Sequence, residues 1–505
     1  MTKETGQESS LRLADRPADN DLAQTAISGV FWSSVQNWGS QTGSLIIFLV
    51  LARLLVPADF GLVALANTFI IFVNLALDQG LSTALVQREQ IETDHWSTVF
   101  WFQLGLGICL TLLVWLISGF IAEVFEQPVL APVLRSLSFI FILRSLILVQ
   151  RASLRRHFAF KQIAIRALLG VFLSGLVGVG LALTGRGVWS LVGQQLMFEF
   201  VGVIVFWRAS DWRPRLTFSP ARLKELSSFG LSIFCSNVLA FFNNHFDTLL
   251  IGYFLGEVAL GYYAIAYRVL QVLIQLLIGT GNQVALPVLS RLQTNPSRLL
   301  GAFYKIVGYV SLAAIPVFAG VSTLAPELVW VVFGQPWTPA VPVIQILAFS
   351  GLFYIILFFN TSVFVAIGRP VLRLRLELAN VIINTIACLV AIKGGIIAVA
   401  CAYAISDFLA IPISLWTLSK AVKISLISYT KLFCVPAGLT TIAVILAGSL
   451  RYWLNTFLLP SAVLIACTIA GAAVCIAGFK LFLPAVFREL ERYLKSRLYK
   501  TEILQ

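Results

Sequence analysis

Apolar runs about as long as a membrane is thick recur along the whole of this 505-residue chain. A helix needs roughly 20 consecutive apolar residues to cross the hydrocarbon core of a bilayer. Runs of this length, bounded by charged residues, Pro or Gly, predict about fourteen spans and therefore an all-α polytopic membrane protein. Their approximate centres are residues 40, 70, 107, 139, 173, 197, 238, 272, 312, 354, 383, 407, 440 and 468.

The composition argues against a soluble protein and against several kinds of site. The chain is 59% hydrophobic and 12% charged, whereas a soluble chain carries about 25% charged residues. Its seven cysteines stand singly in apolar segments, which argues against a disulfide framework and a metal site. It contains no G-x-x-x-x-G-K-[ST] phosphate cradle and no grouping of residues suited to catalysis. We therefore expect neither a cofactor nor an enzyme.

The basic residues are concentrated in alternate loops. A formal net charge of +13 could indicate a nucleic-acid partner, but this distribution instead fits the positive-inside rule, which assigns the loops after even-numbered spans to the cytoplasm. Both chain ends are then cytoplasmic, and no nucleic acid is expected. The two loops with the largest basic clusters contain Arg151, Arg155, Arg156, Lys161 and Arg166 after the fourth span, and Arg208, Arg213, Arg215, Arg222 and Lys224 after the sixth.

An internal repeat is detectable at a shift of 200 residues. "LLVPADFGLVALA" (54–66) aligns with "FLGEVALGYYAIA" (254–266), which pairs Gly61 with Gly261. Six spans separate the two copies, so the halves are expected to be parallel repeats, with a substrate site at their interface as in many transporters. The expected organisation is a disordered tail (1–25), a six-helix lobe (26–208), a cytoplasmic linker (209–226), a second six-helix lobe (227–420), two additional helices (421–483) and an amphipathic cytoplasmic tail (484–505).

Polar residues inside the spans are candidates for function, because lipid penalises them. They gather in spans one, two, seven and eight, the spans that the repeat superimposes. Arg268, Gln271 and Gln275 share one helix face, and the planar fork of an arginine suits a phosphate. The predicted substrate-binding residues are Arg268, Gln271, Gln275, Asn244, His245, Asn74, Gln41 and Asn282, and the predicted ion-coupling residues are Asp78, Asp247 and Glu377.

Each of these residues also has a structural interpretation. Asn and Gln side chains often form hydrogen bonds between packed membrane helices. Asp247 could pair with Arg268, and His245 could bond a helix carbonyl. The sequence does not choose between these roles and substrate or ion binding.

The stretch "ARLLVPADFGLVALANTFIIFVNLALDQGLSTALVQR", followed by "STVFW", resembles the polysaccharide transporter branch of the superfamily that also contains multidrug exporters and lipid II flippases. "DTLLIGYFLGEVALGYYAIAYRVLQVLIQLL" and "VFVAIGRPVLRLRLELANVIIN" resemble the same branch, and the likeness extends over roughly residues 27–420. It is greatest to the colanic-acid-type lipopolysaccharide biosynthesis flippases.

The resemblance implies two six-helix lobes in a V around a central cavity, with two added helices. It implies a bacterial inner-membrane protein that exports an oligosaccharide carried on undecaprenyl pyrophosphate by alternating access. Basic residues in the cavity would receive the pyrophosphate and acidic sugars, with Arg268 as the leading match. The expected partners are this substrate, membrane lipids, and a polymerase and export machinery, with the flippase itself a monomer.

Two other functions remain open at this stage. A cation-coupled multidrug exporter of the same fold would have a smaller, more apolar cavity, and Arg268 would repel its substrates. A membrane polysaccharide polymerase or ligase would need a sizeable outer loop with catalytic residues, whereas the predicted outer loops are short.

Overall fold

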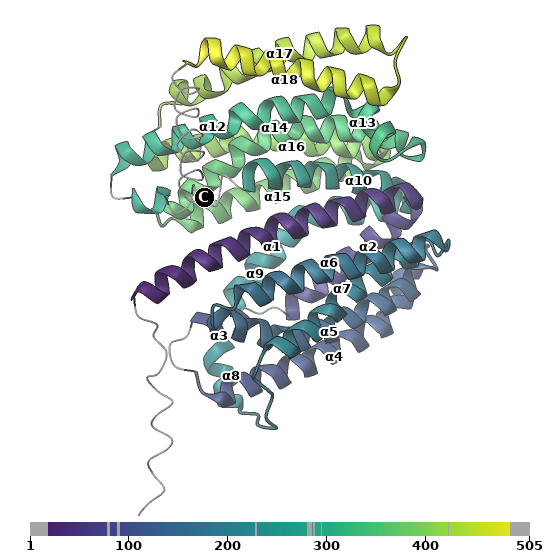
Figure 1. The fold of residues 1–505 in the computed structure, drawn as a ribbon, viewed down its shortest axis with the longest axis vertical. Coiled ribbons are helices and arrows are strands. Elements are labelled where there is room, and N and C mark those ends of the chain that lie inside the picture. The colour runs from purple at the N-terminus through teal and green to yellow at the C-terminus, as the bar shows by residue number, and fades with distance from the viewer. Residues whose placement is uncertain are drawn as a thin grey trace, which may run out of the picture. The chain divides into compact units, whose positions relative to one another are not determined.

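The computed structural model describes residues 19–77, 81–87, 91–227, 230–279, 285, 288–293, 295–422 and 424–484. All regular elements within these residues are helices (Figure 1). The chain packs as two compact units. The first unit comprises Met1–Leu54 and Phe69–Ser236, and the second comprises Leu55–Thr68 and Asn237–Gln505.

Two helices belong partly to each unit, namely α2 (Pro57–Leu77) and α9 (Gly230–Phe254). The other helices of the first unit are α1 (Asp19–Leu54), α3 (Leu81–Gln87), α4 (Thr93–Val124), α5 (Leu130–Arg156), α6 (Phe160–Leu183), α7 (Val188–Ala209) and α8 (Pro220–Ser227). The other helices of the second unit are α10 (Gly256–Ile274), α12 (Pro296–Thr323), α13 (Ala325–Val332), α14 (Val341–Ala366), α15 (Pro370–Ala391), α16 (Gly395–Val422), α17 (Leu426–Leu454) and α18 (Pro460–Phe482). A π-helical turn at Gln275–Gly279 and short 3₁₀ helices at Gln335–Ala340 and Ile392–Gly394 complete the second unit.

The predicted all-α membrane fold is confirmed. Each of the fourteen predicted span centres lies within one of the long helices. Eleven stretches of the described residues are long and apolar enough to cross a membrane, and one of them, Val371–Val422, contains both α15 and α16. The total of fourteen spans, and their grouping into two six-helix lobes with two added helices, stay predictions.

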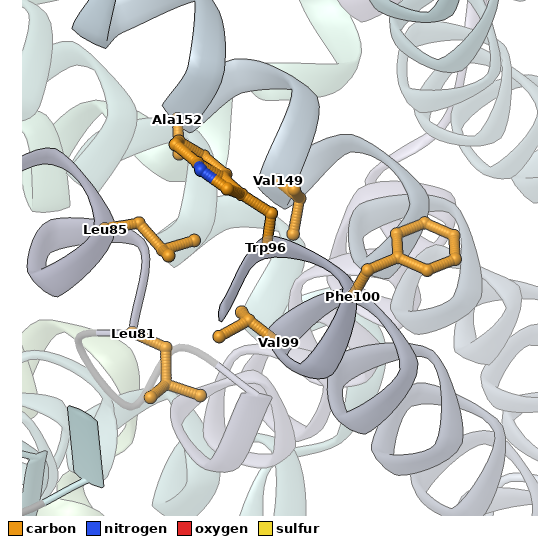
Figure 2. Close-up of a cluster of buried hydrophobic side chains, with 7 residues drawn as sticks. All are labelled: Leu81, Leu85, Trp96, Val99, Phe100, Val149 and Ala152. Carbon is orange, nitrogen blue, oxygen red and sulfur yellow. The ribbon is translucent and has the colours of Figure 1, made fainter. Parts of the chain in front are cut away.

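A hydrophobic cluster holds one end of α3, α4 and α5 together in the first unit. Figure 2 shows its side chains, which are Leu81, Leu85, Trp96, Val99, Phe100, Val149 and Ala152. The segment after α7 lies across α4, because the Arg215 N–H donates to Ser97 Oγ (3.1 Å) and Trp101 Nε1 donates to the Arg215 carbonyl (2.7 Å). Trp212 and Leu223 add their side chains to the cluster. These contacts hold α3 and α5, two of the helices that line the cavity described below, against α4.

The sequence repeat is visible as a reciprocal helix crossing within the second unit. A Cβ atom on Gly61 of α2 would lie 1.7 Å from the Glu257 carbonyl oxygen, and one on Gly261 of α10 would lie 1.9 Å from the Pro57 carbonyl oxygen. Only glycine allows two helix backbones to approach this closely. Both contacts join positions that the 200-residue shift superimposes, so the two glycines occupy equivalent places in one symmetric contact.

Further from this crossing, the two units share helix pairings and a turn. The neighbours α4–α5, α5–α7 and α6–α7 of the first unit correspond to α12–α14, α14–α16 and α15–α16 of the second. Left-handed residues end the equivalent helices α5 and α14, with φ of +54° at Phe158 and +72° at Gly368. In both turns the next N–H donates to the carbonyl five residues earlier (2.9 and 2.8 Å), which is the Schellman arrangement. The repeat therefore extends beyond the short stretches in which the sequence reveals it.

Candidate functional site

The first unit contains a cavity of about 680 Å³ that is lined by arginine. Its walls come from α1, α2, α3, α5, α6 and α7, and all of its lining residues belong to this unit. The charged lining residues are Arg144, Arg151, Arg155, Arg166 and Glu199. Among the described lining residues, four guanidinium groups and one carboxylate carry a net charge of +3, so the cavity suits an anion.

Helix α5 supplies three of the four arginines along one face. Arg144, Arg151 and Arg155 are seven and four residues apart, a spacing that places their side chains on the same side of a helix. At a rise of 1.5 Å per residue, the first and last are about 16 Å apart along the helix axis. Arg144 is half-buried, whereas Arg151 and Arg155 are exposed. The helix thus presents a row of positive charge rather than a single point.

Glu199 on α7 joins Arg144 to the fourth arginine, Arg166 on α6. Its Oε1 accepts from Arg144 Nε (2.9 Å), and its Oε2 accepts from Arg166 Nη2 (3.0 Å). The side chains of Glu199 and Arg166 are 11% and 14% exposed, whereas that of Arg144 is 40% exposed. The Arg144 side chain is therefore more accessible than those of Glu199 and Arg166, which are largely enclosed.

Aromatic packing and one glycine hold Arg166 in place. Its guanidinium carbon lies 4.2 Å from the ring centroid of Phe198 and 5.7 Å from that of Phe206, within the range of cation–π attraction. A Cβ atom on Gly202 would lie 2.8 Å from both Nε and Nη2 of Arg166. Arg166 Nε is buried and, among the described residues, has no hydrogen-bond partner. Residues of α7 thus hold the guanidinium in place.

Neutral polar side chains complete the cavity wall. Gln36, Asn74 and Ser82 lie on α1, α2 and α3. The Asn74 Oδ1 atom is buried and has no hydrogen-bond partner within the described part of the chain. Among the described residues that were predicted to bind substrate, Asn74 is the one that lines this cavity. A ligand with hydroxyl groups as well as negative charge would find partners for both.

Three other members of that set lie elsewhere on α1 and α9. Gln41 is half-buried on α1. Asn244 is exposed and its Nδ2 donates to the Ala240 carbonyl of its own helix (2.8 Å). The His245 ring lies 5.0 Å from the ring of Phe241. Asn282 and the ion-coupling candidate Asp78 fall outside the described residues.

The predicted row on α10 belongs to the second unit. Arg268 is half-buried, and Gln271 and Gln275 are exposed. Gln275 begins the π-helical turn that follows α10. Substrate binding by these three residues stays a prediction.

The two described ion-coupling candidates have local partners. Asp247, 3% exposed, accepts from the Tyr263 hydroxyl (2.5 Å) and from the Thr248 N–H (2.7 Å). Glu377 Oε1 accepts from Arg373 Nε (2.6 Å) one turn away. These contacts are compatible with the structural interpretation of both carboxylates, and ion coupling stays a prediction.

None of the five charged cavity residues was predicted from the sequence to belong to a site. Arg151, Arg155 and Arg166 were interpreted as markers of orientation, and Arg144 and Glu199 were not selected. The signal that could have found them is the helical spacing of Arg144, Arg151 and Arg155, which begins inside an apolar run. Glu199 had no such signal, because its partners are 55 and 33 residues away in sequence.

The sequence profile of the family described as "Polysaccharide biosynthesis protein" matches residues 50–342, more than half of the chain. The chain belongs to this family. The resemblance seen in the sequence is thereby confirmed.

Curated relatives of the chain carry names from the same area of biochemistry. The teichuronic acid biosynthesis protein TuaB of Bacillus subtilis is 24% identical over 90% of this chain and 95% of its own length. The lipopolysaccharide biosynthesis protein WzxC of Escherichia coli is 27% identical over 66% of this chain and 68% of its own length. The succinoglycan biosynthesis transport protein ExoT of Rhizobium meliloti is 28% identical over 65% of this chain and 66% of its own length.

Solved structures share the fold at low sequence identity. The lipid II flippase MurJ, in an inward closed conformation, superimposes with a TM-score of 0.74 at 14% identity, over 91% of this chain and 100% of that one. A multidrug resistance MATE family transporter of the MOP superfamily, in an inward-facing conformation, gives a TM-score of 0.58 at 18% identity, over 75% of this chain and 96% of that one. The chain therefore shares its fold with these two solved structures.

Proposed function

We propose that this protein is a flippase of the bacterial inner membrane that moves undecaprenyl-pyrophosphate-linked oligosaccharide units for a surface polysaccharide. The observation that carries the proposal is the cavity with four arginines and one glutamate in the first unit. The names of the family and of its relatives, which refer to polysaccharide biosynthesis and to transport, support it. The shared fold with a lipid II flippase is compatible with it.

The charge and length of the cavity fit a diphosphate with a glycan attached. A guanidinium can donate two parallel hydrogen bonds to a phosphate. Arg144 and Arg166 both donate to Glu199, so their guanidinium groups are near enough to each other for one pyrophosphate to contact both. The row on α5 extends about 16 Å, which is longer than a diphosphate. We therefore assign the pyrophosphate to Arg144 and Arg166, and acidic groups of the glycan to Arg151 and Arg155.

The mechanism that we propose is alternating access. The predicted lobes 26–208 and 227–420 would rock so that the polar cavity takes up the headgroup from the cytoplasmic leaflet and releases it outside, while the lipid tail stays in the bilayer. An ion gradient acting through Asp78, Asp247 or Glu377, or consumption of the product by a polymerase, would supply the free energy. The protein acts as a monomer with both termini in the cytoplasm, and binds rather than converts its substrate.

The charge of the cavity argues against the alternative of a multidrug exporter for cations. Three net positive charges repel a cationic compound and attract an anionic one. The proposal therefore commits to an anionic headgroup.

Replacement of Arg144 by Gln tests the proposal. The variant keeps a polar side chain but removes the charge that faces the cavity, so export is expected to fall at least about ten-fold, since one charged hydrogen bond is worth roughly 1.5 to 3 kcal/mol. The measurement is surface polysaccharide and undecaprenyl-linked oligosaccharide in cells that carry only the variant. Lipid-linked oligosaccharide should accumulate.

Arg135→Gln is the matched control. Arg135 lies on the same helix, and its Nε donates to Ser118 Oγ (2.8 Å) outside the cavity. Export by this variant should stay near the wild-type level. Undiminished export by Arg144→Gln, at wild-type protein amounts, would refute the assignment of the cavity.

A further inference from the structure

We propose that Glu199 is a built-in competitor for the phosphate groups of the substrate, which weakens anion binding and so allows the headgroup to leave after transport. This inference rests on the proposed function, because it assigns the cavity to an anionic headgroup. It gives a role to Glu199, the one acidic residue among the described residues that line this otherwise basic cavity.

The carboxylate of Glu199 already occupies the place that an anion would take. Each of its oxygens accepts from a different guanidinium, at 2.9 Å from Arg144 and 3.0 Å from Arg166. A phosphate group that bridged the same two arginines would share their positive charge with Glu199. Glu199 is therefore positioned as an internal anion between two of the four arginines, and its side chain is 11% exposed.

The two arginines differ in how easily they could exchange partners. Arg166 is 14% exposed and enclosed by Phe198 and Phe206, so its contact with Glu199 is the fixed one. Arg144 is 40% exposed and uses only its Nε for Glu199. Because a guanidinium carries five N–H donors, both terminal nitrogens of Arg144 remain for a phosphate. Arg144 is thus the arginine that Glu199 and the substrate would share.

The physical consequence is a lower affinity in exchange for faster release. A transport site must bind well enough to load and weakly enough to unload. With Glu199 neutralised, Arg144 and Arg166 would face a diphosphate without this opposing charge. A carboxylate one guanidinium away from a bound phosphate repels it, and at an effective dielectric constant of about 20 this repulsion reduces affinity by about ten-fold or more.

This role differs in its consequences from that of a purely structural ion pair. If Glu199 only held Arg144 and Arg166 in place, its removal would disorder them and weaken anion binding. If Glu199 competes with the substrate, its neutralisation strengthens binding and slows transport. Affinity and transport then change in opposite directions, which loss of structure does not produce.

The first measurement is binding of inorganic pyrophosphate to the purified full-length protein in lipid nanodiscs at low ionic strength, by titration calorimetry. Glu199→Gln should bind about ten-fold more tightly than wild type. Glu92→Gln should bind like wild type, because Glu92 pairs with Arg222 (2.9 Å) and is not a lining residue of the cavity. In an Arg144→Gln background the gain from Glu199→Gln should disappear, which a double-mutant cycle measures.

The second measurement is export in cells. Glu199→Gln, at wild-type protein amounts, should yield less surface polysaccharide and retain lipid-linked oligosaccharide. Glu199→Asp keeps the charge but withdraws it by one methylene from Arg144, so it should bind pyrophosphate with an affinity between those of wild type and Glu199→Gln. If Glu199→Gln does not accumulate as folded protein, Glu199→Asp decides the question.

The possible outcomes separate the two proposals. Equal pyrophosphate binding by wild type and Arg144→Gln, or none by either, would refute the proposed function of the cavity. Binding that is lost in Arg144→Gln but unchanged or weakened in both Glu199 variants would refute only the competitor role. Tighter binding with undiminished export would refute the link between Glu199 and release.

Discussion

Arg166 and Gly202 illustrate how the cavity depends on single residues. Arg166 can lie against α7 only because position 202 has no side chain, since a Cβ atom there would be 2.8 Å from two of its nitrogens. Phe198 and Phe206 then cover the guanidinium from the same helix. One helix thus supplies the space, the packing and, through Glu199, the counter-ion for this arginine.

Gly202→Ala is therefore expected to displace Arg166 from its position. Overpacking of this kind costs about 1–3 kcal/mol, and the shifted guanidinium would lose its contact with Glu199. We expect reduced export of surface polysaccharide and a lower thermal unfolding temperature of the purified protein. Gly105→Ala is the control, because a Cβ atom there would meet no atom within 4 Å. Equal loss in both variants would show that the packing of Arg166 is not the cause.

The site could be predicted from sequence only in part, and the reason is physical. Asn74 was identified because a polar residue in an apolar span is costly and therefore conspicuous. Arg151 and Arg155 were not, because basic residues near the ends of spans also determine orientation, and the sequence does not separate the two roles. Glu199 could not be predicted, because its ion pairs with Arg144 and Arg166 form only in the folded protein.

At the scale of helices, the reciprocal crossing of α2 and α10 is the contact with the least room for change. Gly61 and Gly261 each face a backbone carbonyl of the other helix rather than a movable side chain. A substitution at either position must therefore separate the helices.

Gly61→Ala and Gly261→Ala should each destabilise the protein by at least the roughly 1–3 kcal/mol typical of overpacking. Because the two positions are equivalent by the repeat, the two losses should be similar. The measurement is the thermal unfolding temperature in detergent, with Gly301→Ala as a control in open space. An unchanged unfolding temperature in both variants would contradict the close approach of α2 and α10 at these glycines.

A buried ion pair ties α17 to α13 in the second unit. Glu327, 5% exposed, accepts from Arg451 Nε (2.6 Å), and the same oxygen accepts from Asn455 Nδ2 (3.4 Å). Its other oxygen is buried and has no hydrogen-bond partner among the described residues. The carboxylate thus depends on Arg451 for compensation of its charge.

Removal of one partner should cost more than removal of both. Glu327→Ala or Arg451→Ala leaves an uncompensated charge, a loss of about 3–5 kcal/mol, whereas the double variant removes the pair together. Thermal unfolding of the two single variants and the double variant forms the test. Strictly additive losses would indicate that the pair contributes no coupling energy.

The helices were the most predictable part of the molecule. Each predicted centre lies in a long helix, because the length of an apolar run is what a bilayer requires of a span. Short helices such as α3, α8 and α13 were not predicted, since seven or eight residues give too little periodicity. The equivalence of Gly61 and Gly261 in the repeat was detected in the sequence, whereas the contact between their two helices was not predicted.

For the whole molecule, the two units share their helix pairings, but the arginine cavity lies in the first unit. Equivalent helix pairings in the two units indicate a common architecture. The arginine cavity is a feature of the first unit, whereas the predicted candidates Arg268 and Asp247 lie in the second. The account therefore assigns capture of the anionic headgroup to the first unit.

The most direct test of the central claim is the leaflet distribution of undecaprenyl-linked oligosaccharide in cells that lack this protein. The account predicts that the lipid-linked units accumulate on the cytoplasmic leaflet and that surface polysaccharide disappears. Wild-type protein should restore delivery to the outer leaflet and the surface polysaccharide, and Arg144→Gln should restore neither. Normal delivery to the outer leaflet in the absence of the protein, together with sensitivity to cationic drugs, would contradict the account.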